Sequence, residues 1–255
     1  MGRSVKRESV ERESVERDKC HDALTLHAPT LHAPDVRQRL FVALRVPEEV
    51  RGQVEKAQGE LRRSAPQARV TWTRPEQFHL TLRFLGNVEG GRVAGLVEAV
   101  RGVCVGFAPL RLRAEGVGCF PDLRSPRVVW LGVRDAEEAL PRLQRAIETA
   151  SAGFTAQERE QRFSGHVTLG RIKSIGRPEA QSLGSQARAM SDRFFGQWTA
   201  DQVEIMRSEL SSQGARHTIL ATVPLARWRV RTVAGFDNGK AQFKSIRTQG
   251  SSVEC

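Results

Sequence analysis

The chain has 255 residues, of which 39% are hydrophobic and 27% are charged, enough for one large domain with a sizeable core. This composition excludes a disordered polar chain, and no apolar run approaches the roughly 18 residues that a membrane-spanning helix needs. Forty Lys and Arg residues against 29 Asp and Glu give a net charge of +11, which favours polyanionic partners such as RNA.

The two ends of the chain are polar and repetitive. Residues 7–17 repeat a five-residue charged unit, and residues 26–34 repeat Leu-His-Ala-Pro; neither pattern can build a core. We expect a flexible tail over 1–38, one domain over 39–233 and a second flexible tail over 234–255. Because the first residues lack the apolar segment of a signal peptide, we expect a cytoplasmic protein.

The cysteines are too widely spaced for a Cys-x-x-Cys pair: they are Cys20, Cys104, Cys119 and Cys255. This spacing argues against a zinc site and a disulfide framework, and it is typical of a reducing compartment. We interpret Cys104 and Cys119 as small core residues. The tail histidines near Cys20 belong mostly to the Leu-His-Ala-Pro repeat, so no metal is expected.

Apolar spacing predicts alternating strands and amphipathic helices along the domain. Strands are expected at 40–44, 78–84, 110–114, 127–133, 166–169, 198–206 and 217–223, and helices at 47–61, 93–100, 140–147 and 178–190. In strand 78–84, Phe78, Leu80, Leu82 and Phe84 are expected to face the core, with His79, Thr81 and Arg83 on the opposite face. The absence of regular βαβ alternation favours an α+β fold with largely antiparallel sheets.

One short pattern occurs in both halves of the domain: His79-Leu80-Thr81 and His166-Val167-Thr168. In a strand, residues two apart point to the same side, so each segment presents an imidazole beside a hydroxyl. If the halves pack about an approximate two-fold axis, the two imidazoles could face one cleft. A neutral imidazole can take a proton from an attacking oxygen while an imidazolium gives one to a leaving oxygen, which suits phosphodiester chemistry without metal.

These motifs, with the segments around them, resemble the two-histidine (2H) phosphoesterase superfamily, and more narrowly the bacterial RNA 2′,3′-cyclic phosphodiesterases, also called 2′-5′ RNA ligases. The segments that carry the resemblance are 39–44, 78–86, 118–121, 126–133, 165–171 and 208–214, in the family's order over about residues 39–225. The resemblance implies a bilobed α+β domain with two largely antiparallel sheets about a pseudo-two-fold axis, outer helices and a central cleft.

The resemblance also implies hydrolysis of RNA 2′,3′-cyclic phosphate ends to 2′-phosphates, without metal or cofactor. His79 would be the proton donor to the departing ribose oxygen, and His166 the base that activates water. Thr81 and Thr168 would bind phosphate oxygens, and Arg171 is a candidate phosphate contact. We expect a monomer that acts on RNA and does not bind membranes.

Two positions depart from the family pattern. Gly170 stands where the family usually has Ala, and His217 stands where it often has Tyr; the chain contains no Tyr. We interpret His217 as a structural strand residue rather than a third catalyst, and we assign Phe120 and Phe163 to the core. Two alternatives stay open: 2′-5′ ligation of tRNA halves as the main activity, and a non-catalytic RNA-binding module.

Overall fold

The structure is a computed structural model that describes residues 36–159, 162–211, 214–226, 232–237 and 240–245. The helices are α1 (Glu48–Ser64), α2 (Val93–Cys104), α3 (Ala139–Ala150) and α4 (Arg177–Ala189), and short 3-10 turns lie at Pro75–Gln77, Gly90–Arg92 and Ala152–Phe154. The strands of the main sheet are β1 (Arg37–Arg45), β2 (Arg69–Trp72), β3 (His79–Glu89), β4 (Leu110–Phe120), β5 (Val128–Asp135), β6 (His166–Ser174), β7 (Phe194–Ala200), β8 (Gln202–Ser211) and β9 (Gly214–Pro224).

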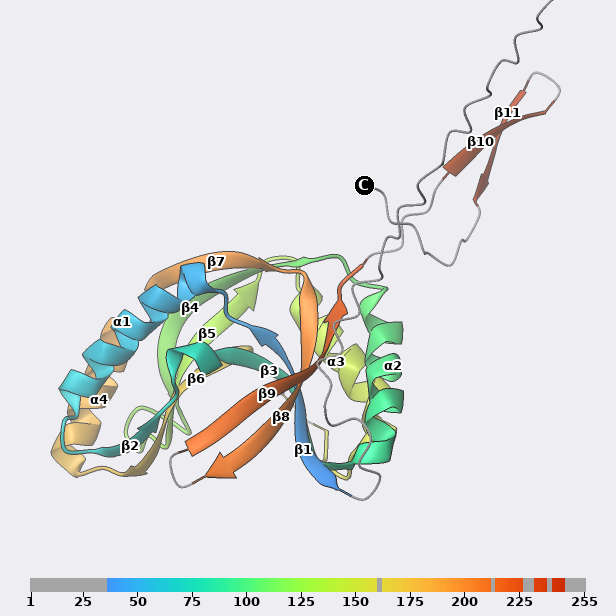
Figure 1. The fold of residues 1–255 in the computed structure, drawn as a ribbon. Helices are drawn as coiled ribbons and strands as arrows, with labels where there is room; N and C mark the ends of the chain where they lie inside the picture. The colour runs from blue at the N-terminus through green and yellow to red at the C-terminus, as the bar shows by residue number, and fades with distance from the viewer. Residues whose placement is uncertain (1–35, 160–161, 212–213, 227–231, 238–239, 246–255) are drawn as a thin grey trace, which may run out of the picture.

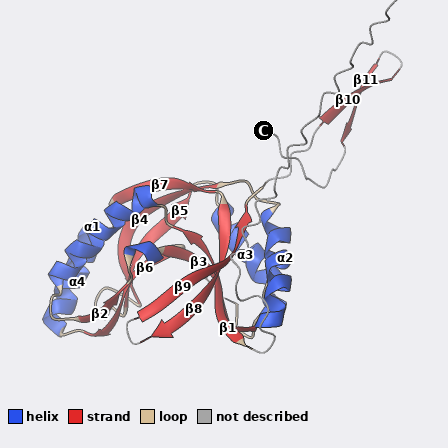
Figure 2. Cartoon of the chain, viewed as in Figure 1, coloured by secondary structure: helices blue, strands red, loops and turns tan. Residues whose placement is uncertain are grey.

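The sheet follows the order β7-β4-β5-β6-β3-β1-β8-β9, and β2 adds to β6 outside this path. Every pairing in it is antiparallel. The predicted α+β class with antiparallel pairing is confirmed. The two expected sheets are joined into one curled sheet where β3 meets β6, and helices cover its outer sides (Figure 2).

The chain order β1-α1-β3-α2 recurs as β5-α3-β6-α4. The sheet order has the same symmetry, because β3 and β6 are the central neighbours and each is followed outward by the first strand of its own repeat. Helices α1 and α4 pack together over the β4–β7 half, while α2 and α3 pack together over the half that contains β3 and β9 (Figure 1). The repeat thus places its two histidines, which begin β3 and β6, at the centre of the sheet.

The core fills the space between the sheet and the helices. Leu80 and Val167, the middle residues of the two His-x-Thr motifs, are fully buried. Cys104 and Cys119 are buried too, as predicted. The apolar stripe of α1, with Val54 as a central member, packs inward as its spacing indicated. The described helices include none long and apolar enough to cross a membrane.

The strict alternation predicted for strand 78–84 holds through Leu82, which is buried, and is wrong at Arg83 and Phe84. The register passes from Ala43↔Thr81 to Val42↔Arg83, so Leu82 is an extra residue in the ladder. Such a β-bulge reverses the facing of the residues that follow. Arg83 is therefore buried, and Phe84 is 52% exposed instead of lying in the core.

Other differences concern the boundaries of elements. The predicted strand 198–206 is two strands, β7 and β8, which meet at Asp201, and β2 was not predicted. Strand β1 begins two residues before the predicted domain boundary. A separate two-stranded sheet of β10 (Thr232–Asp237) and β11 (Lys240–Ser245) begins two residues before the predicted tail 234–255 and lies otherwise within it. The flexibility of both tails stays a prediction, and residues 1–35 lie outside the described part.

Candidate active site

The two His-x-Thr motifs meet at one residue pair. Leu80 of β3 lies opposite Val167 of β6, and this is the pair through which the two halves of the sheet join. In an antiparallel pair this register sets His79 across from Thr168 and Thr81 across from His166. Because side chains alternate, all four point to the face opposite the core. Diagonal neighbours of this kind lie about 7–8 Å apart at the backbone, so both imidazoles flank one small area.

His79 is half-buried and its ring orientation is fixed. Its Nδ1 donates a hydrogen bond to the carbonyl oxygen of Gln77 at 2.7 Å, which leaves Nε2 as the free ring nitrogen. Burial lowers the pKa of His79 from 6.5 to about 4, against the opposing effect of the Gln77 hydrogen bond. Coulombic repulsion from His217, Arg171 and His166 lowers this pKa further. The free protein therefore carries a neutral His79 at pH 7.

His166 has the same local geometry. Its Nδ1 donates to the carbonyl oxygen of Ser164 at 2.8 Å, two residues earlier, as in the His79 motif. The His166 ring packs edge-on against Phe120, with ring centroids 5.2 Å apart. Phe120 is half-buried beside the motif histidine and is not part of the core, so its predicted core position is wrong, whereas Phe163 packs against the core as predicted.

A cavity of about 960 Å³ opens over this area. Its lining includes His79, Thr81, Thr168 and Arg171; His166 is not part of the lining. The structure thus brings four of the five predicted site residues to one cavity, with His166 diagonally across the β3–β6 junction from His79. Thr hydroxyls and a guanidinium are suited to hydrogen-bond the nonbridging oxygens of a phosphate.

A second β-bulge directs Arg171 into the cavity. The register of β6 on β5 passes from Trp130↔Thr168 to Val129↔Gly170, so Leu169 is the extra residue. The carbonyl oxygen of Leu169 accepts hydrogen bonds from the Gln58 side chain at 2.9 Å and from the backbone N–H of Thr73 at 2.9 Å. The sequence did not indicate Gln58, because a lone Gln on a helix has no pattern that marks it.

The bulges occupy equivalent places in the two motifs. Leu82 and Leu169 each stand three residues after the motif histidine, and Phe84 and Arg171 each stand five residues after it. Arg83, beside the first bulge, donates to Glu148 at 2.8 Å and to the carbonyl oxygen of Glu158 at 2.7 Å. Each bulge is thus held by buried polar groups from elsewhere in the chain.

His217 of β9 lies against His79 rather than away from the site. The two rings meet edge to face at 5.1 Å, and Phe41 packs on both, at 4.9 Å from His79 and 5.0 Å from His217. Burial lowers the pKa of His217, and its Nδ1 is buried without a hydrogen-bond partner. The sequence predicted that His217 is a structural strand residue and did not indicate this direct contact with the His79 ring.

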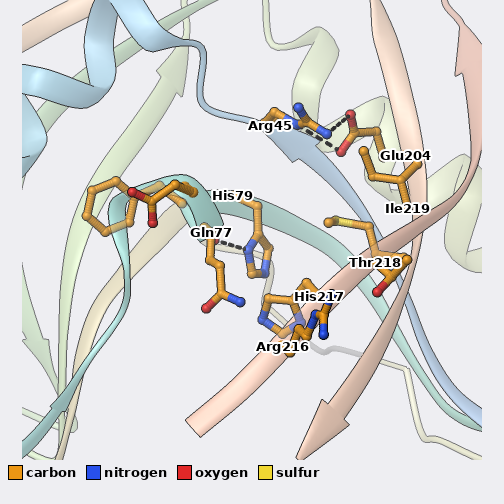
Figure 3. A pocket seen from close by; sticks show the side chains of 11 residues that line it. Arg45, Gln77, His79, Glu204, Arg216, His217, Thr218 and Ile219 are labelled. Carbon is orange, nitrogen blue, oxygen red and sulfur yellow. Dashed lines mark hydrogen bonds and ion pairs between the residues drawn. The ribbon is translucent and has the colours of Figure 1, made fainter. Parts of the chain in front are cut away.

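A smaller cavity of about 450 Å³ adjoins the first and shares Gln77, His79 and His217 with it (Figure 3). The ion pair between Arg45 and the buried Glu204 lies at its far side, with a closest N–O distance of 3.1 Å. Burial raises the pKa of Glu204, and the Arg45 charge opposes this. His79 and His217 therefore line both cavities.

Within the described residues, no three His, Cys, Asp or Glu side chains gather as a metal site would require. The tail histidines and Cys20 considered in the sequence lie outside those residues. A curled antiparallel sheet with two His-x-Thr strands at its centre defines a protein of the two-histidine phosphoesterase class.

Comparisons with known proteins agree with this class. The model of the LigT-like phosphoesterase family matches residues 44–130. An RNA 2′,3′-cyclic phosphodiesterase from Archaeoglobus fulgidus is 34% identical over 69% of this chain and 94% of its own. One from Methanothermobacter thermautotrophicus is 31% identical over 72% of this chain and 96% of its own. A crystal structure of a Thermus thermophilus protein has a TM-score of 0.62 at 26% identity, covering 75% of this chain and 100% of the other.

The chain therefore belongs to the LigT-like phosphoesterase family.

Proposed function

We propose that the protein hydrolyses RNA 2′,3′-cyclic phosphate ends to 2′-phosphates, by acid–base catalysis between His79 and His166. The observation that carries this proposal is the Leu80–Val167 register, which puts both imidazoles and both threonine hydroxyls on one face of the sheet. The names of the two archaeal relatives support the substrate, and a cavity without carboxylates supports an anionic ligand.

In the proposed reaction, Nε2 of His166 takes a proton from water as the water oxygen attacks phosphorus. The bond between phosphorus and the ribose 3′-oxygen breaks, and His79 gives its proton to that oxygen. One water molecule thus opens the cyclic phosphate. His166 ends protonated and His79 ends neutral, so each histidine has the protonation state that the other had at the start. Thr81, Thr168 and Arg171 hydrogen-bond the nonbridging oxygens as negative charge builds on them.

A proton donor must be protonated in the complex, whereas free His79 is neutral at pH 7 because its pKa is about 4. The negative charge of a phosphate beside the His79 ring favours the protonated form and so raises the pKa of His79. The neighbouring cations have the opposite effect. The substrate thus supplies the charge that lets His79 hold the proton it later donates. The mechanism needs no metal, so activity should persist in EDTA.

The decisive experiment is product analysis with a short oligoribonucleotide that ends in a 2′,3′-cyclic phosphate. The unmodified protein should yield a 2′-phosphate, and His79→Ala and His166→Ala should each lower turnover about 10²–10⁴-fold, the reach of one general acid or base. Wild-type rates in either variant would refute the assignment. Adding RNA with a 5′-hydroxyl end to the same reaction would reveal 2′-5′ joining as the main outcome, and binding without conversion would indicate a binding module.

A further inference from the structure

The strands β2 and β6 form a ribbon that extends beyond the β3–β6 junction and lines the larger cavity. Thr71 of β2 lies opposite Arg171 of β6, and Trp72 lies opposite Gly170. Lys173, two residues beyond Arg171, lines the same cavity, as does Arg74 just after β2. We call Trp72, Arg74, Arg171 and Lys173 the basic ribbon.

The position of the Trp72 indole depends on Gly170, the glycine that departs from the family pattern. A Cβ added at Gly170 would stand 2.7 Å from Cε3 of Trp72, a distance at which something must shift. Arg62 of α1 lies over the same indole, 5.3 Å from the ring centroid, and donates to the Gln58 side chain at 2.9 Å. Trp72 is thus held in a defined place while it lines the cavity.

The cations of this cavity are free to bind anions. Four of its lining residues carry fixed positive charge, namely Arg39, Arg74, Arg171 and Lys173, and the lining contains no Asp or Glu. In the described residues none of these four forms an ion pair, whereas many other surface arginines do. Unpaired cations beside an aromatic ring are the combination that binds single-stranded nucleic acid, through phosphate contacts and base stacking.

We propose that the basic ribbon binds the RNA strand on the 5′ side of the cyclic phosphate, with a base on Trp72 and backbone phosphates at Lys173 and Arg74. This inference rests on the proposed function and adds a subsite to it. A cyclic mononucleotide carries no such upstream phosphate, so it cannot use these contacts. The ribbon therefore makes the protein select strand ends over free cyclic nucleotides.

The test compares an octaribonucleotide that ends in a 2′,3′-cyclic phosphate with 2′,3′-cyclic AMP. Lys173→Ala and Trp72→Ala should each raise KM for the octaribonucleotide about tenfold, with at most a twofold change for the mononucleotide. Gly170→Ala should act like Trp72→Ala, because the new Cβ displaces the indole. The matched control is Lys56→Ala, which removes the same charge from an exposed site on α1 and should change neither KM.

Binding of the 2′-phosphate octaribonucleotide gives two readouts that a merely structural role would not move. One lost phosphate contact should lower the slope of log Kd against log salt concentration by about 0.7 in Lys173→Ala. Quenching of tryptophan fluorescence should vanish in Trp72→Phe and persist in Trp198→Phe.

The outcomes separate the two proposals. If the unmodified protein opens neither substrate, the proposed function is wrong. If it opens both and the Lys173 and Trp72 variants raise the two KM values equally, or the salt slope is unchanged, the basic ribbon does not bind the strand.

Discussion

Leu80 lies directly opposite Val167, and this buried pair is where the two halves of the sheet meet. Neither side chain touches the cleft face, yet their pairing decides which residues do. A slip of either strand by one residue would turn that strand's imidazole into the core and away from the other, because side chains alternate along a strand. The apolar middle residue of each His-x-Thr motif therefore fixes the register of the site.

Breaking the buried ion pair between Arg83 and Glu148 is expected to destabilise the fold. Their side chains are 5% and 7% exposed, and Arg83→Ala removes this ion pair together with the hydrogen bonds that Arg83 donates to the carbonyl oxygens of Glu158 and Gln157. Arg83→Ala should lower the free energy of unfolding by about 3–5 kcal/mol, measured by urea denaturation. Arg111→Ala is the control, because its pair with Glu137 is exposed on both sides and should contribute at most about 1 kcal/mol. Equal losses in the two variants would contradict this view.

Acid should destabilise the fold through His79. Its pKa is about 4 in the folded protein and 6.5 without the fold. Between these values the unfolded chain binds a proton that the folded protein does not, so stability falls as the pH drops from 6.5 to 4. The full loss is on the order of 3 kcal/mol, from 1.36 kcal/mol per pKa unit. Thermal unfolding of the unmodified protein and of His79→Gln from pH 7 to pH 4 measures it; the variant should lose less, and parallel curves would exclude His79 as the cause.

The site was only partly predictable from the sequence. Alternation correctly put His79 and Thr81 on one side, because the period of two holds up to Thr81. It failed at Arg83 and Phe84, since the extra residue Leu82 in the ladder leaves no trace in the apolar pattern. Whether a strand carries a bulge depends on distant partners.

At the first bulge, Leu82, the distant partner is Glu148, which binds the neighbouring Arg83. At the second bulge, Leu169, it is Gln58, which binds the Leu169 carbonyl oxygen. Both lie on helices far from the motifs in the chain. Fold class and the antiparallel pairing, by contrast, follow from local spacing of apolar residues and from the order of the elements. The contact between His217 and His79 also needed the structure, because β9 reaches β3 only through β8 and β1.

His217 is expected to hold the pKa of His79 down. A protonated His217 would place a second positive charge 5.1 Å from the His79 ring. His217→Phe keeps the aromatic contact with Phe41 but removes this charge, so the pKa of His79 should rise slightly, while burial, the main cause of its low value, still holds it below 6.5. It also removes the buried Nδ1 that has no hydrogen-bond partner, so the free energy of unfolding should not fall. NMR titration of the His79 ring, with Phe194→Ala as a control at an exposed aromatic of β7, measures the shift; an unchanged titration in His217→Phe would show that the two rings are in contact without electrostatic coupling.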